Sequence, residues 1–192
     1  MKKRLTEFID PRSLKPTLSD IAQAVKKPVD KIYLAEGKQW KWRDMFYAVI
    51  DGEGAKFGSY RALLCWLEAV IQMLISCTDW EILAEMIAVA EWELEHYPYP
   101  KAHKQQLQQV LVEQKARLEV LKAQAADLMK AWEWAKAWTP VLESCPNQTT
   151  LNIALQLYAA QKPQFEAYPQ VFDSIRQVGR QRREYLRSLE VA

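Results

Sequence analysis

The sequence predicts a mainly α-helical protein: a helical bundle of about five helices including one long helix, preceded by a small N-terminal α+β segment. Glycine, which helices avoid and turns need, is rare, and four of the five glycines lie between Gly37 and Gly58. Beyond them, apolar side chains recur at the three- and four-residue spacing of amphipathic helices. We therefore predict two parts, residues 1–58 as the α+β segment and residues 59–192 as the helical bundle.

The N-terminal segment has the pattern of short elements separated by turns. A helix is expected over 19–25, with Ser19 as its N-cap. The aromatic, β-prone run 40–50 lies between turn-like sequences at 36–38 and 51–54. This pattern predicts a small hairpin.

The remaining chain predicts a succession of helices. The first is apolar on nearly every face and should therefore be central. Thr78 and Glu81 have the spacing of a capping box at the start of the second. The two prolines in 97–100 end that helix, which should turn back and pack against the next one. The expected spans are 60–76, 79–96, 101–138, 148–161 and 170–190, and the expected contacts are Leu83, Ile87 and Leu94 against Leu107 and Leu111.

The segment 101–138 should form the long helix, because it contains neither glycine nor proline before Thr139-Pro140. A straight helix of this length would span about 57 Å. That exceeds the diameter of roughly 40 Å expected for one compact domain of this size. The sequence leaves open whether the helix is straight or breaks near the small residues 123–126. The helix also carries a heptad seam, whose residues recur in alternating steps of four and three: Leu107, Leu111, Gln114, Leu118, Leu121, Ala125, Leu128, Trp132 and Ala135.

The C-terminal end of this helix is a candidate protein interface. Trp132 falls on the seam, whereas Trp134 and Trp138 are four residues apart and point away from it. Tryptophan is enriched where proteins anchor their partners. The alternative is that the last two helices cover these rings within the chain.

The last predicted helix carries a stripe of arginines. Arg176, Arg180, Arg183 and Arg187 recur at i, i+4, i+7 and i+11, which places them on one face. Such a stripe can bind nucleic-acid phosphates. It can equally be a solvated face or pair with the acidic helix 79–96.

Residues 21–33 resemble a helix-turn-helix motif, with apolar residues on both sides of a short turn. Lys26 and Lys27 stand where that motif usually has a glycine and an apolar residue. If the motif binds DNA, the following hairpin would act as a wing; otherwise the segment is a helical corner. The candidate nucleic-acid contacts are Lys27, Lys31, Tyr33, Lys38, Lys41 and Arg43.

Residues suited to catalysis are few. The only histidines are His96 and His103, seven residues apart, and neither a nucleophile motif nor metal-ligand spacing is present. The three cysteines include no C-x-x-C pair. No apolar run approaches the roughly 20 residues needed to cross a bilayer.

We therefore expect a non-enzymatic cytoplasmic protein without cofactor, metal, membrane or small-molecule substrate. Its expected function is that of a helical adaptor or subunit that docks into a larger protein assembly, with a protein partner or a homo-oligomer. Nucleic-acid binding, as a DNA regulator or a ribonucleoprotein subunit, is the alternative.

Overall fold

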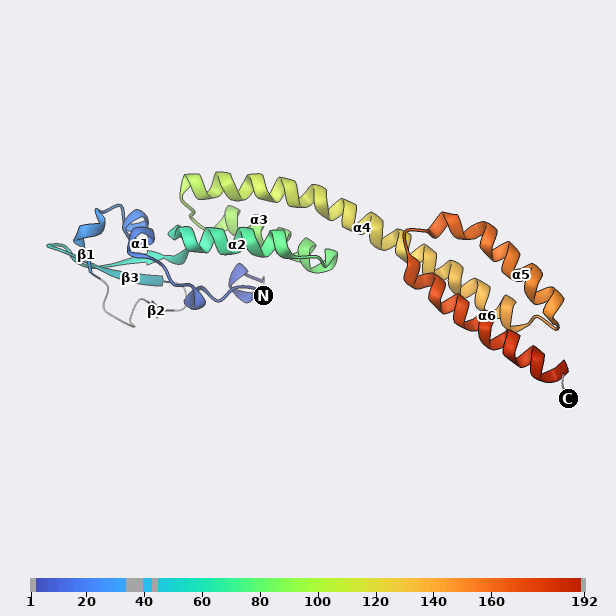
Figure 1. Ribbon diagram of the computed structural model, residues 1–192. Coiled ribbons are helices and arrows are strands. Elements are labelled where there is room, and N and C mark those ends of the chain that lie inside the picture. The colour runs from blue at the N-terminus through green and yellow to red at the C-terminus, as the bar shows by residue number, and fades with distance from the viewer. Residues whose placement is uncertain (1–2, 34–39, 43–44, 191–192) are drawn as a thin grey trace. The chain divides into compact units, whose positions relative to one another are not determined.

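The computed structural model describes residues 3–33, 40–42 and 45–190 (Figure 1). The predicted fold class, mainly α-helical with one long helix and a small N-terminal α+β segment, is confirmed. The chain divides into two compact units, residues 1–121 and 122–192. The expected boundary at residue 58 lies inside the first unit, because the sheet and the helices that follow it share one core.

A small antiparallel sheet occupies the N-terminal part of the first unit. Its strands are β1 (Ile32–Tyr33), β2 (Trp40–Trp42), β3 (Met45–Ile50) and β4 (Gly54–Ser59). Strands β3 and β4 pair along their whole length as a hairpin, whereas β1 and β2 pair with opposite ends of β3. The run 40–50 thus contributes two strands, β2 and β3.

Alternation along β3 directs one side of the sheet toward the core. Phe46, Ala48 and Ile50 are buried, as expected for a strand with one covered face. The hairpin turn uses Gly52 and Gly54, whose φ angles of 74° and 78° lie in the left-handed region that favours glycine.

Helix α1 (Leu18–Val25) begins one residue earlier than expected. Its N-cap is Thr17 and not Ser19: the Thr17 hydroxyl accepts the Asp20 N–H, and the Asp20 carboxylate accepts the Thr17 N–H. This reciprocal pair satisfies two backbone donors that a helix start leaves free.

Within 26–33 no second α-helix follows α1, so these residues do not take the helix-turn-helix form that their spacing resembles. Lys26 ends α1 in a left-handed conformation, and the chain continues through a 3₁₀ turn (Val29–Lys31) into β1. β-Branched and aromatic residues favour extended backbone. Pairing of Ile32 and Tyr33 with β3 then satisfies their backbone groups in the sheet.

Helix α2 (Leu64–Ser76) supplies much of the first core, with Trp66, Leu67, Val70 and Leu74 buried. Helix α3 (Trp80–His96) follows it. The N-cap of α3 is Asp79, whose carboxylate accepts the N–H groups of Glu81 and Ile82, so the expected capping box is replaced by an aspartate cap.

Helix α3 turns back and packs against the first part of α4 (Lys101–Glu143), as the sequence predicted (Figure 1). The predicted contact residues all belong to the same buried cluster: Leu83, Ile87, Leu94, Leu107 and Leu111.

Arg117 of α4 also holds the end of α2. The last carbonyls of a helix have no partner within it. Arg117 donates at 2.7 Å to the carbonyl oxygens of both Ile75 and Cys77 and therefore caps α2 from outside.

Helix α4 continues beyond its predicted end and contains Pro140. Proline cannot donate the N–H that would bond the carbonyl four residues earlier. The helix continues because Leu142 is fully buried in the second core, and the Ser144 N–H closes the last turn on the Pro140 carbonyl at 3.0 Å.

The second unit packs α5 (Gln148–Gln161) and α6 (Pro169–Glu190) alongside the end of α4 (Figure 1). A 3₁₀ turn (Lys162–Phe165) joins the two shorter helices. Arg182 of α6 donates twice, at 3.0 and 2.7 Å, to the carbonyl oxygen of Cys145 just after α4. It thereby ties α6 to the end of α4.

Candidate functional site

The three tryptophans near the end of α4 do not share one surface. Trp132 is 44% exposed and lies off the face that packs on α5 and α6. Trp134 stacks on Tyr158 of α5, with 5.3 Å between ring centroids. The indole N–H groups of Trp134 and Trp138 both donate to Gln161 Oε1, at 2.8 and 3.2 Å. Helix α5 therefore partly covers Trp134 and Trp138 from within the chain.

An apolar groove of about 490 Å³ runs between α4 and α5 beside these two rings. Trp134, Trp138 and Val141 line it from α4. Ile153 and Leu157 line it from α5. Val141, Ile153 and Leu157 are 46%, 53% and 56% exposed, so the groove opens onto a patch of large apolar side chains.

Helix α5 carries no charge at all, because no Asp, Glu, Lys or Arg occurs between Glu143 and Lys162. Surface helices normally place charged residues on the side that faces water. Exposed aliphatic side chains without charges are instead typical of the centre of a protein interface. We call this surface the α5 face; it comprises the groove and the exposed residues Val141, Thr149, Ile153, Gln156, Leu157 and Ala160.

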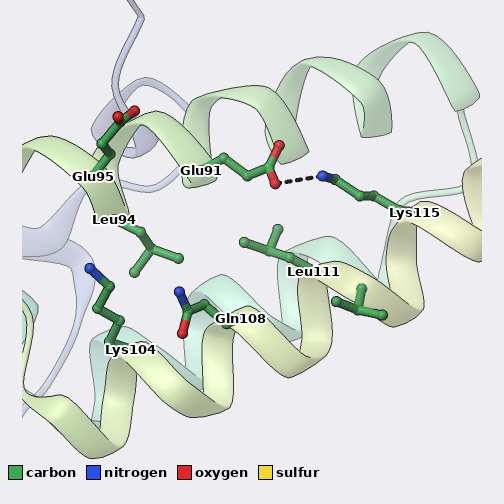
Figure 2. Close-up of a pocket in the computed structure, with 8 residues that line it drawn as sticks. Glu91, Leu94, Glu95, Lys104, Gln108, Leu111 and Lys115 are labelled. Atoms are coloured by element: carbon green, nitrogen blue, oxygen red, sulfur yellow. Dashed lines mark hydrogen bonds and ion pairs between the residues drawn. The ribbon is translucent and has the colours of Figure 1, made fainter.

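A second groove, of about 440 Å³, lies between α3 and α4 in the first unit (Figure 2). Leu94 and Leu111 line it but are only 5% and 3% exposed. Its two walls are joined by Lys115, whose Nζ donates to the Glu91 carboxylate at 2.5 Å (Figure 2). Among the residues that line this groove Val112 is apolar and exposed, but a docking partner would have to displace the Glu91–Lys115 ion pair. The α5 face is therefore the better candidate.

The first unit contains a buried charge that sequence reasoning missed. Glu93 of α3 is fully buried. Its Oε1 accepts the N–H of Leu5 at 3.0 Å. Its Oε2 accepts Arg61 Nε at 2.9 Å and the Tyr99 hydroxyl at 3.0 Å. One carboxylate thus joins the N-terminal 3₁₀ turn (Leu5–Glu7), the segment before α2 and the loop before α4.

Their place beside Glu93 keeps Arg61 charged and Tyr99 protonated, so both can donate hydrogen bonds to the carboxylate. Burial disfavours the charged guanidinium of Arg61, but the hydrogen bond and charge of Glu93 outweigh burial and raise its pKa. The same guanidinium lies 4.5 Å from the ring centroid of Tyr60 and 4.0 Å from that of Tyr97. Burial, followed by the charge of Glu93, raises the pKa of Tyr99. These contacts form a structural tie centred on Glu93, in which the buried Nη2 of Arg61 has no hydrogen-bond partner among the described residues.

The predicted arginine stripe lies along α6. Arg176, Arg180 and Arg187 are exposed, and Arg183 is half-buried. Arg176 Nη1 donates to the carboxylate of Asp173 at 3.0 Å, so one of the four cations is already paired.

One of the candidate basic residues near α1, Lys27, already has a partner. Lys27 forms an ion pair with Glu53. Hydrogen bonds from Lys27 and then from Lys56 lower the pKa of Glu53 to about 2. Lys31 and Tyr33 are exposed. Lys38, Arg43 and the side chain of Lys41 lie outside the described residues.

Within the described part of the chain, no three His, Cys, Asp or Glu side chains are grouped so that they could hold a metal ion. No helix described there has both the length and the apolar character required to span a bilayer. Burial raises the pKa of the Cys65 thiol to about 11.

No protein-family model, curated protein or solved structure matches the chain.

Proposed function

We propose that this protein is a non-enzymatic helical subunit that docks into a larger protein assembly through the α5 face. The observation that supports this function is the uncharged, solvent-exposed surface of α5 beside an apolar groove. Covering apolar surface contributes about 25 cal/mol of favourable free energy per Å² removed from water. A protein partner can bury Ile153 and Leu157 without desolvating any charge on α5.

The groove also supplies a rigid wall. Trp134 and Trp138 are fixed by their shared acceptor Gln161, so they lose little side-chain freedom on binding. Aromatic residues of this kind commonly dominate interface energetics. Trp132, exposed elsewhere on α4, remains a separate candidate contact.

Replacing Leu157 with aspartate is expected to reduce the amount of co-purifying partner protein by about tenfold or more, because the change places a charge in an apolar interface. The chain and the Leu157→Asp variant would be isolated from the source cells at moderate salt, and associated proteins quantified by mass spectrometry. Ala159→Asp is the matched control, since Ala159 is exposed on the same helix two residues away and points to another side. Equal retention by both variants would remove the α5 face as the docking site.

The tryptophans are less suitable probes of docking. Trp134 and Trp138 both contact Tyr158 in the second core. Truncating them would therefore destabilise the unit as well as alter its surface. Substitutions at Ile153 or Leu157 avoid that ambiguity, because these side chains are more than half exposed.

Nucleic-acid binding is the second candidate, supported by the three exposed arginines on one face of α6. If α6 binds phosphates, Arg180→Ala combined with Arg183→Ala should reduce the salt slope of binding by about two. Fluorescence anisotropy of a labelled duplex, measured at several salt concentrations, gives that slope. The control, Lys130→Ala with Lys136→Ala, removes two exposed cations from α4 and should leave it unchanged. Identical slopes in both pairs would count against an α6 contact.

A further inference from the structure

We propose that α3 carries a peptide-binding site of its own, which residues 3–9 cover. We call these residues the N-terminal strap. When the strap leaves, the site takes an extended segment of a partner protein in which a lysine stands two residues before a leucine. The site belongs to the first unit, so this proposal does not depend on the α5 face.

The strap itself shows which chemistry the site accepts. Leu5 is fully buried in the first core, and the 3₁₀ turn that it begins packs on α3. The Leu5 N–H donates to Glu93 Oε1 at 3.0 Å. Two residues earlier, the ammonium group of Lys3 forms an ion pair with Glu85. A segment that binds in place of the strap must therefore supply an apolar side chain, a backbone N–H and a cation.

The strap can leave without stranding a buried charge. Glu93 Oε2 accepts Arg61 Nε and the Tyr99 hydroxyl, and neither of these donors belongs to the strap. The carboxylate would therefore stay compensated, and its Oε1 would become an open acceptor in the vacated site. The hydrogen bonds that close the turn of the strap run between its own residues, so they move with it.

A partner segment can make more contact with α3 than the strap does. An apolar groove of about 420 Å³ lies beside the ion pair of the strap, lined by Lys3 and Glu85 together with Ala88, Val89 and Trp92. A segment with a large apolar residue next to its lysine would fill this groove as well as the site of the leucine. The additional burial offsets the advantage that the strap has from being tethered to the same chain.

The charge of α3 selects a basic segment. The helix contains five glutamates and neither lysine nor arginine: Glu81, Glu85, Glu91, Glu93 and Glu95. Glu81 is exposed one turn before Glu85, which holds the lysine of the strap. A cationic segment is therefore attracted to this face, and an acidic one is repelled.

A fluorescently labelled peptide with the sequence of residues 1–9 tests the proposal. Leu5→Asp should release the strap, because a carboxylate without a partner is costly to bury. Since a closed strap lowers the apparent affinity in proportion to the open fraction, the variant should bind the peptide about tenfold or more tightly than the unmodified chain. Fluorescence anisotropy measures both affinities. Ser13→Asp adds the same charge at an exposed position beyond the strap and should bind like the unmodified chain.

Exchanging charges tests the position of the lysine. Glu85→Lys, added to Leu5→Asp, should weaken binding of the peptide severalfold, because two ammonium groups then face each other. A peptide that carries Lys3→Glu should bind this double variant better than the original peptide does. The opposite order would place the lysine elsewhere and overturn the proposed site.

Nuclear magnetic resonance of the unmodified chain provides a test that does not depend on the folding of a variant. The chain is isotope-labelled and the peptide is not, so the signals come from the chain alone. Excess peptide should displace the strap and move the amide signal of Leu5 to a position typical of unstructured chain. The signals of the second unit should stay in place.

The proposal is overturned if Leu5→Asp, folded by circular dichroism, binds the peptide no more tightly than the unmodified chain. It is also overturned if excess peptide leaves the Leu5 signal of the unmodified chain unchanged. Light scattering distinguishes the source of the segment. A two-chain species that the peptide converts to single chains would identify the strap of a second copy, and not a partner protein, as the occupant.

Discussion

Replacing Glu93 with glutamine is expected to destabilise the first unit by about 3–5 kcal/mol, because it leaves the buried guanidinium of Arg61 without a counter-charge. Glutamine keeps a carbonyl oxygen that can accept the Leu5 N–H. The loss of stability therefore reports mainly the missing charge. Arg61 and Glu93 are 6% and 0% exposed, and water cannot replace the lost partner. Few single substitutions in this chain should have a larger effect.

Hydrogen–deuterium exchange of the α2 and α3 amides measures this loss, because it reports opening of the first unit separately from the second. The matched control is Glu91→Gln, which breaks the exposed pair with Lys115. An exposed pair of this kind contributes about 0–1 kcal/mol. If exchange in the two variants were equally fast, the Glu93 tie would have no structural importance.

Truncating Trp66 to alanine should cost about 3–5 kcal/mol, the usual range for removing a fully buried large aromatic side chain. Trp66 is 0% exposed in the first turn of α2, and its ring meets that of Tyr60 edge-on with 4.4 Å between centroids. A loss of this size is a third or more of the stability of a typical domain. Thermal unfolding followed by circular dichroism should therefore show a strongly lowered midpoint.

Trp80→Ala provides the comparison for that experiment. Trp80 also belongs to the first unit, but it is 36% exposed at the start of α3. Its truncation leaves a smaller void and should lower the midpoint much less. Equal effects of the two substitutions would mean that α2 is not the centre of the first core.

The helices follow from local information in the sequence. Helix α3 is bounded by Asp79 and by the prolines after Tyr97, and its apolar residues repeat with the helical period. Such signals depend on residues a few positions apart, so they can be read without the rest of the fold. The same holds for the packing of α3 on α4, because a short loop forces consecutive helices to be neighbours.

Pairing with a strand that is distant in sequence determined the structure of residues 32–33 in the N-terminal segment. The residues after Lys27 suit a helix-turn-helix on spacing alone, yet Ile32 and Tyr33 join the sheet through β3, which lies well after them in the chain. Backbone pairing between distant segments overrides a weak local preference. Single-sequence reasoning cannot see such a partner.

The candidate site was only partly predictable. The sequence pointed to Trp134 and Trp138, and the uncharged run of α5 was visible in it, but only the structure shows that Ile153 and Leu157 stand exposed beside those rings. Exposure depends on which helix covers which face. That is decided by all packed elements together, and not by the period of one helix.

By itself the sequence determined the helical class, the long helix and most helix ends, because caps, prolines and periodic apolar residues act locally. Only the tertiary structure decided the role of Glu93. Glu93 lies on the same buried face of α3 as Met86 and Ala90, and a carboxylate is stable there only because Arg61 and Tyr99 arrive from other segments. A buried charge depends on partners that folding brings together, and no local pattern records them.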